Sequence, residues 1–98
     1  MNFQLLFTDK SEEQFNLLKS NPAFIKRFKS VRKALGLMET NVRHIGLNTH
    51  KFHSLQGPNG EEVFESYTEN NTPGAYRIFW CYGPNKKQIT ILGITSHP

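Results

Sequence analysis

The spacing of apolar positions changes twice along the chain, and each change marks a different kind of element. Residues 2–7 are apolar-rich and end at turn-forming residues, which predicts an N-terminal strand. Ser11 and Gln14 then have the spacing of a capping box, in which two side chains satisfy each other's free backbone amides. We therefore expect a first helix over residues 11–20.

Apolar residues at helical spacing predict a second helix that begins at Pro22 and ends at Leu35, just before Gly36. Proline is well tolerated at the first helical position, and glycine is common immediately after the last one. The buried stripe of this helix would consist of Phe24, Ile25, Phe28, Val31 and Leu35. The remaining positions carry the cations Lys26, Arg27, Lys29, Arg32 and Lys33. We interpret these cations as a solvated face, with a surface that contacts phosphates as the alternative.

The periodicity fades between residues 37 and 58, where asparagine, glycine and proline predict a mostly irregular loop. Three antiparallel strands are expected after this loop, over residues 62–67, 75–82 and 87–94. The resulting order, βααβββ, predicts an α+β fold in which two N-terminal helices pack on a small, mainly antiparallel sheet. We expect a single domain over residues 1–98.

Composition narrows the class of protein. Hydrophobic residues make up 37% of the chain and charged residues 20%, which is typical of a folded domain rather than a disordered one. The single cysteine, Cys81, excludes an internal disulfide and is expected to be a buried thiol in a reducing cytosol. Because no apolar run approaches membrane-spanning length and no signal-peptide layout is present, we expect a cytoplasmic protein with no membrane partner. The net charge of +4 fits a nucleic-acid partner and an acidic protein partner equally well.

Arg77 stands out because it interrupts an apolar strand. Successive side chains of a strand point to opposite faces, so Arg77 and Phe79 share one face and the bulkier residues share the other. The bulkier set, which we expect to pack on the helices, is Tyr76, Ile78, Trp80 and Tyr82. An arginine stays charged and is poorly suited to burial without a partner. We therefore expect Arg77 on a face that is open, concave or covered by a partner.

The histidines of the middle segment do not form a recognisable metal site. His50 and His53 have a spacing that can hold a metal ion on a helix, but no cysteine or nearby carboxylate completes a zinc site. Neither a metal nor a cofactor is therefore expected. Ordinary loop histidines are the simplest interpretation, and contact with RNA phosphates is the alternative.

Several short motifs resemble those of the RelE/ParE superfamily of bacterial toxin–antitoxin toxins. They are Leu55-Gln56-Gly57, Val63-Phe64-Glu65-Ser66-Tyr67, Tyr76-Arg77-Ile78-Phe79-Trp80 and the end of the last strand, Thr95-Ser96-His97-Pro98. In that family a Leu-x-Gly turn leads into a strand, a Tyr-Arg-aliphatic strand follows, and the last strand delivers a catalytic or RNA-contacting residue. The resemblance covers nearly the whole chain and implies a RelE-like fold.

The messenger-RNA-cleaving branch of this family implies a ribonuclease chemistry. The 2′-hydroxyl of RNA serves as the nucleophile, so the protein supplies proton transfer and stabilises charge on the phosphate. The resemblance assigns the phosphate to Arg77, and general acid or base catalysis to His97. It implies that Glu65 orients Arg77 or acts as the base. The residues expected to contact RNA are Lys51, His53, Tyr67, Lys86 and Lys87.

Two departures from the family pattern keep alternatives open. RNA-cleaving relatives commonly carry further cations on the strand that holds Glu65, and Tyr67 occupies the position where one is expected. Phosphate stabilisation would then come from Lys51, Lys86, Lys87 or the ribosome. Arg77 and Glu65 are also suited to a purely structural cross-strand ion pair, and His97 to an unconstrained chain end.

Two hypotheses follow from this resemblance. In the first, the chain is a toxin that cleaves translated messenger RNA with the help of the ribosome and is covered by a cognate antitoxin. In the alternative, it is a non-nucleolytic, ParE-like toxin that binds DNA gyrase, or a catalytically inactive binding protein, because one fold serves both branches.

Overall fold

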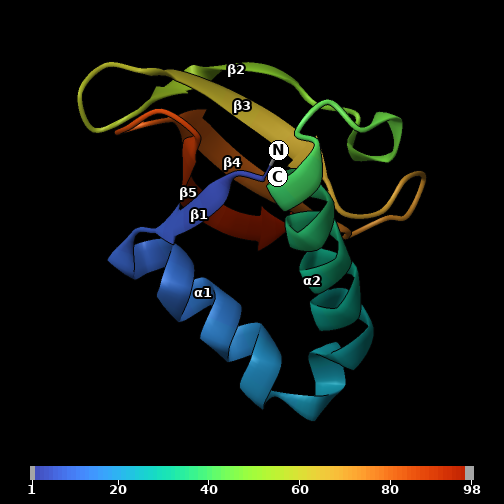
Figure 1. Ribbon diagram of the computed structural model, residues 1–98. Helices are drawn as coiled ribbons and strands as arrows, with labels where there is room; N and C mark the ends of the chain where they lie inside the picture. Colours follow the sequence, from blue (N-terminus) through green and yellow to red (C-terminus); the bar gives the residue numbers. More distant parts are fainter. Residues whose placement is uncertain (1, 97–98) are drawn as a thin grey trace.

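Two helices lie on one side of a five-stranded sheet in the computed structural model, which describes residues 2–96 (Figure 1). The sheet has the order β1-β5-β4-β3-β2, in which β1 and β5 are parallel and the other neighbours are antiparallel. The elements are β1 (Gln4–Phe7), α1 (Asp9–Ser20), η1 (Pro22–Phe24), α2 (Ile25–Thr40), η2 (Ile45–Leu47), β2 (His50–Gln56), β3 (Glu62–Tyr67), β4 (Tyr76–Tyr82) and β5 (Gln88–Ser96). The expected α+β class is confirmed, but the chain contains one strand more than βααβββ allows.

The start of α1 differs from the predicted capping box. The side chain of Thr8 caps the helix by accepting a hydrogen bond from the backbone N–H of Ser11, so α1 begins at Asp9. Ser11 donates its hydroxyl to the carbonyl of Ile91, 2.8 Å away, and the side-chain oxygen of Gln14 accepts from the N–H of Ile94 at 2.7 Å. The capping-box prediction is wrong because both side chains bond to β5 instead.

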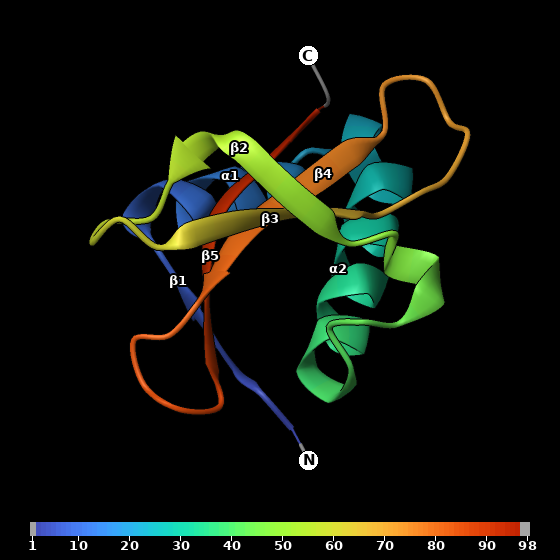
Figure 2. The same ribbon diagram turned by 90° about the horizontal axis from the view of Figure 1, so that it is seen from above.

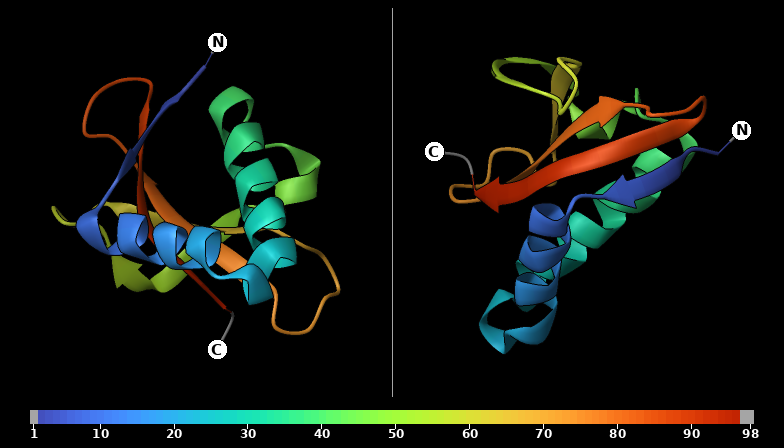
Figure 3. Two further views of the ribbon diagram at one scale, coloured as in Figure 1. Left: turned by 90° about the horizontal axis from the view of Figure 1, so that it is seen from below. Right: turned by 90° about the vertical axis from the view of Figure 1, so that its left-hand side faces the viewer.

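These two bonds complete the edge of β5. Strand β1 pairs with β5 only as far as Ile91, so the second half of β5 has no strand neighbour on that side among the described residues. Polar side chains from the first turns of α1 contact the backbone there. The helix is thereby fixed against the sheet at the point where β1 ends (Figure 3).

Helix α2 is longer than predicted and begins later. It continues through Gly36 to Thr40, so the expected stop at Gly36 is wrong. Phe24 and Ile25, which were expected in the buried stripe, are exposed because η1 and the first turn of α2 project beyond the sheet (Figure 1). The central part of the helix packs as expected, since Val31 and Leu35 are buried.

The core lies between the helices and the strands β4 and β5. Trp80 is fully buried, as predicted, and its indole N–H donates to the hydroxyl of Ser66 at 2.8 Å. The Ser66 hydroxyl lies 2.7 Å from that of Thr49, so the polar atoms of this region satisfy one another. The residues that surround Trp80 include Leu18, Val31, Met38, Ile78, Ile89, Ile91 and Ile94.

Residues 50–56 form the strand β2, although a loop was expected there. This difference affects the candidate site, because β2 lies next to the strand that holds Glu65. The strand pairs with β3 at the edge of the sheet, with His50 opposite Glu65 and Lys51 opposite Phe64. Six of its seven residues are exposed and only Phe52 is partly covered. No apolar alternation marks such a polar edge strand, because neither of its faces is buried. No helix in the described part of the chain is long and apolar enough to cross a membrane.

Candidate functional site

The side chains of Glu65, Tyr67 and Arg77 meet on the face of the sheet that points away from the helices. The register between β3 and β4 places Tyr67 directly opposite Arg77, and Glu65 opposite Phe79. Directly opposed residues of antiparallel strands project from the same face. Arg77 faces away from the helices, as the alternation along β4 predicts, because its neighbour Ile78 lies in the core.

Arg77 is held by both neighbours. Its Nε lies 3.9 Å from Oε2 of Glu65, and its guanidinium carbon lies 3.8 Å from the centre of the Tyr67 ring. The arginine side chain is 14% exposed and that of Glu65 only 4%. The cross-strand pair of Arg77 with Glu65 is confirmed, but the arginine is not on an open surface, since its own chain covers most of it.

His50 joins this cluster from β2. Its Nε2 lies 2.7 Å from Oε1 of Glu65, and its Nδ1 lies 2.9 Å from the backbone oxygen of Asn48. The ring meets that of Tyr67 edge-on, with 5.5 Å between the centroids, and the side chain is 48% exposed. Glu65 therefore lies between an imidazole and a guanidinium. A His–Glu–Arg arrangement can bind an anion and move a proton.

The contact of His50 with Glu65 was not predicted, because residues 37–58 were expected to form a loop. A strand assignment for residues 50–56 would have put His50 on one face of an edge strand, and only the pairing with β3 brings it to Glu65. The signal in the sequence is weak, since the motif HKFHSLQ does not alternate between apolar and polar residues.

An apolar groove borders the cluster on the same face. Phe52 follows His50 by two residues on β2, and Phe79 follows Arg77 by two on β4; their ring centroids are 4.8 Å apart. The groove has a volume of about 630 Å³, and Thr95, the register partner of Arg77 on β5, also lines it. None of His50, Glu65 and Arg77 lines this groove, and Lys10 and Gln14 of α1 form part of its wall, so the groove lies next to the charged cluster and is separate from it.

Three solved structures have the same overall fold as this chain. The YoeB dimer from Staphylococcus aureus matches over 100% of both chains, with a TM-score of 0.64 and 15% sequence identity. The archaeal RelE–RelB complex from Pyrococcus horikoshii OT3 matches 98% of this chain and 96% of its own, with a TM-score of 0.62 and 15% identity. The YoeB/ParE toxin from Agrobacterium tumefaciens matches 98% and 100%, with a TM-score of 0.62 and 10% identity.

The chain has the RelE/YoeB toxin fold. No protein-family model and no curated protein matches the sequence itself. At identities this low the likeness establishes the RelE-like fold and leaves the activity to be argued from the site. The fold implied by the short motifs around Glu65 and Arg77 is confirmed.

The other predicted site residues lie in different places on the RelE-like fold. Lys51 neighbours His50 but projects with Phe64, and its Nζ lies 3.2 Å from Oε2 of Glu62. Lys86 and Lys87 lie in the turn between β4 and β5, at the opposite end of β4 from Arg77 (Figure 2). The structure thus brings Glu65, Tyr67 and Arg77 together and leaves both turn lysines outside the cluster.

The two remaining predictions concern histidines. His53 is an exposed residue of β2, and its contact with RNA stays a prediction. His97, the predicted general acid or base, lies outside the described residues. Between residues 2 and 96, no group of three or more histidine, cysteine or acidic side chains is arranged to hold a metal ion.

Cys81 is buried, as predicted. Burial raises the pKa of its thiol, and the negative charge of Glu61 raises it further. A raised thiol pKa disfavours the reactive thiolate. Cys81 is therefore unsuited to nucleophilic chemistry and packs as an apolar residue.

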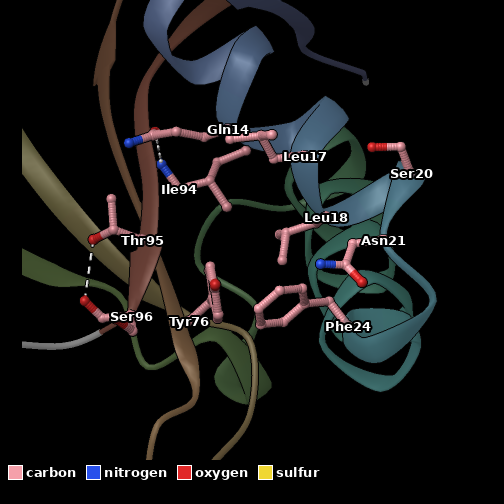
Figure 4. Close-up of a pocket in the computed structure, with 10 residues that line it drawn as sticks. All are labelled: Gln14, Leu17, Leu18, Ser20, Asn21, Phe24, Tyr76, Ile94, Thr95 and Ser96. Carbon is pink, nitrogen blue, oxygen red and sulfur yellow. Dashed lines mark hydrogen bonds between the residues drawn. The ribbon is translucent and has the colours of Figure 1, made fainter.

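A second groove opens on the helix side, along the edge of β5 that β1 does not cover. It has a volume of about 570 Å³, and Leu18, Phe24 and Tyr76 point into it (Figure 4). The described residues that line it include neither a carboxylate nor a histidine nor a cation. This groove is suited to apolar contact and not to catalysis.

Proposed function

We propose that this chain is the toxin of a toxin–antitoxin module and cleaves messenger RNA, with the ribosome supplying part of the active site. The observation that carries the proposal is the cluster of Arg77, Glu65 and a half-exposed histidine on a RelE-like fold. The activity would take place in the cytoplasm, where messages are translated.

Arg77 is the proposed ligand of the scissile phosphate. Its polar contacts within the chain are long, because its distance from Glu65 exceeds that of a hydrogen bond and its Nη1 lies 3.5 Å from the carbonyl oxygens of both Ala75 and Tyr76. A phosphate offers the guanidinium two short, charge-assisted hydrogen bonds in place of these. Binding of RNA would therefore draw Arg77 out from beneath Tyr67.

Glu65 is the proposed positioning residue of the site. Its carboxylate lies beside both the His50 imidazole and the Arg77 guanidinium and is almost inaccessible, which fits orientation of the neighbouring side chains better than direct removal of a proton from RNA. Its two oxygens face different partners, since Oε1 lies toward His50 and Oε2 toward Arg77. The alternative role of Glu65 as the base is therefore the less favoured one.

A cognate antitoxin is the proposed protein partner. One of the structures with this fold is a RelE–RelB complex. The net charge of +4 on this chain favours an acidic or amphipathic segment as the partner. We expect the antitoxin to cover the face that holds Arg77, so that toxin activity depends on its removal.

Induction of the chain in a bacterial host without antitoxin, with mapping of messenger-RNA ends, tests the proposal. We expect growth arrest and sharp in-frame cuts with the wild type, and at least about a 10²-fold loss of cutting with Arg77→Ala, because a lost phosphate donor removes stabilisation of transition-state charge. Arg27→Ala is the matched control. It removes an arginine that pairs with Glu69 at 2.8 Å, away from the cluster, and should leave the cuts intact.

The other outcomes separate the alternatives. Growth arrest with intact messages would favour the ParE-like alternative, with DNA gyrase as the first target to assay. If a folded protein causes neither arrest nor cutting, Arg77 and Glu65 form a structural pair on an inactive toxin fold. That last outcome would refute both toxin hypotheses.

A further inference from the structure

Both ring nitrogens of His50 face hydrogen-bond acceptors. Nδ1 lies 2.9 Å from the backbone oxygen of Asn48, and Nε2 lies 2.7 Å from the carboxylate of Glu65. A neutral imidazole carries one N–H and can satisfy only one of them, whereas the imidazolium donates to both. The geometry around His50 therefore suits the protonated ring.

The two bonds of His50 differ in their access to solvent. The bond to Glu65 is partly buried and ends on a carboxylate that is 4% exposed, whereas the bond to Asn48 is exposed. The proton on Nε2 is held inside the protein, and the proton on Nδ1 lies on the open side. A proton that leaves this ring for a bound substrate is therefore the one on Nδ1.

The groups around His50 reinforce this asymmetry. On β3 it faces the Glu65 carboxylate and the edge of the Tyr67 ring, and Arg77 on β4 lies behind Glu65. On its other side His50 borders a groove that also contains Arg43, Lys51, Glu61 and Glu62. With His50 protonated, the cluster of His50, Glu65 and Arg77 has a net charge of +1, which attracts a phosphate.

We propose that His50 is the proton donor of the cleavage reaction and that Glu65 positions it; this inference rests on the ribonuclease function proposed above. The 2′-oxygen attacks the phosphorus, and its proton passes to solvent water. The bond from phosphorus to the 5′-oxygen breaks as the Nδ1 proton of His50 moves to that oxygen. The products are a 2′,3′-cyclic phosphate, a 5′-hydroxyl and a neutral His50, which regains its proton from water.

After transfer, His50 keeps its Nε2–H on Glu65. The carboxylate thus fixes which tautomer remains and holds the plane of the ring, as a buried carboxylate does for a catalytic histidine in other enzymes. During transfer, the substrate oxygen replaces the backbone oxygen of Asn48 as the acceptor of the Nδ1–H group. His50 would supply a positive charge that β3 lacks, because Glu62–Tyr67 contains no lysine, arginine or histidine.

A message with sulfur in place of one bridging 5′-oxygen tests the proposal, because a thiolate leaves without being protonated. Ribosomes carrying this message or the normal one, with the replaced atom at the mapped cut site, are treated with the full chain. On the normal message we expect His50→Gln to lose about 10²–10⁴-fold in cleavage rate. On the sulfur message it should cut close to the wild-type rate.

His44→Asn is the matched control. His44 is exposed, and its Nδ1 accepts the N–H of Gly46 at the start of η2, a capping role that asparagine also fills. This variant should cut both messages as the wild type does. An equal loss in His44→Asn and His50→Gln would show that the loss is not specific to His50 and would overturn the assignment.

Each other outcome has a definite meaning. His50 is not the proton donor if His50→Gln cuts the normal message at the wild-type rate. The same conclusion follows if the variant folds but cuts neither message while the wild type cuts both. In both cases the ribonuclease function stands. If the wild type cuts neither message, the proposed function and this inference both fail.

Nitrogen-15 spectra of the wild-type imidazole give a test that needs no variant. The neutral ring should carry its proton on Nε2, and a proton on Nδ1 would overturn the inference.

Discussion

Tyr67 covers Arg77 on the face of the sheet that points away from the helices. Its ring lies 3.8 Å from the guanidinium carbon and also meets the edge of His50. A cation over an aromatic ring is stabilised by about 0.5–2 kcal/mol, depending on its exposure. If Arg77 binds phosphate as we propose, the phosphate must offer it better contacts than the Tyr67 ring does.

Cys81 gives a prediction at the scale of one residue. Because burial and the charge of Glu61 raise the pKa of its thiol above the ordinary value of 9.0, the folded protein holds less thiolate at any given pH than the unfolded chain does. We expect an alkylating reagent at pH 8 to label the native protein slowly and the urea-unfolded chain rapidly. Equal rates in the two states would contradict the buried position.

The same raised pKa has a defined effect on stability. The unfolded chain releases the thiol proton first as the pH rises, so the contribution of Cys81 to the free energy of unfolding is complete below the unfolded pKa. It is lost as the pH rises through the range between the unfolded and folded values. Comparison of the wild type with Cys81→Ala in urea at several pH values isolates this contribution.

Two glycines, one in a helix and one in a turn, allow a prediction about the stability of single elements. Gly36 lies inside α2, is exposed, and leaves open space where a Cβ would stand. Gly36→Ala should raise the free energy of unfolding by about 0.5–1 kcal/mol, because alanine is the better helix former. Urea unfolding measures this change. Gly60→Ala is the matched control, since the space there is equally open but φ is +83°, and it should destabilise the fold.

The elements show where sequence patterns suffice and where they fail. The strand that contains Ile78 and Trp80 was predictable because it is a continuous apolar run, and its central residues are buried on both faces of the sheet. Strand β2 was not, because it lies exposed at the sheet edge and its residues need not alternate. The candidate site was likewise predictable only where its residues lie on predicted strands. Arg77 and Glu65 lie on the predicted strands, whereas His50 reaches them only through the missed one.

Lys86 gives a prediction at the scale of the whole molecule. The turn that carries it is separated from Arg77 by the length of β4 (Figure 2), so under the proposed function it can contact RNA but not the scissile phosphate that we propose Arg77 binds. Lys86→Ala should weaken RNA binding and reduce its salt dependence by about 0.7 in slope. The cleavage rate at saturation should not change. A lower saturating rate would contradict this separation of binding from chemistry.

The sheet divides the molecule into a face that packs and a face that carries charge. The helices cover the first, and the second holds the cluster of His50, Glu65 and Arg77 together with the groove at Phe52 and Phe79. Stability therefore depends mainly on one side and the proposed chemistry on the other. Substitution of the half-exposed His50 should therefore affect the packed core less than substitution of the buried Glu65.

The bond from Gln14 to Ile94 has a consequence for the solubility of the chain. An uncovered strand edge is a template on which a strand of another molecule can pair, and such pairing can continue into aggregates. Gln14 occupies the N–H of Ile94 on that edge. The Gln14 side chain thus protects this edge against self-association. Gln14→Val would expose the edge and make the chain prone to aggregate.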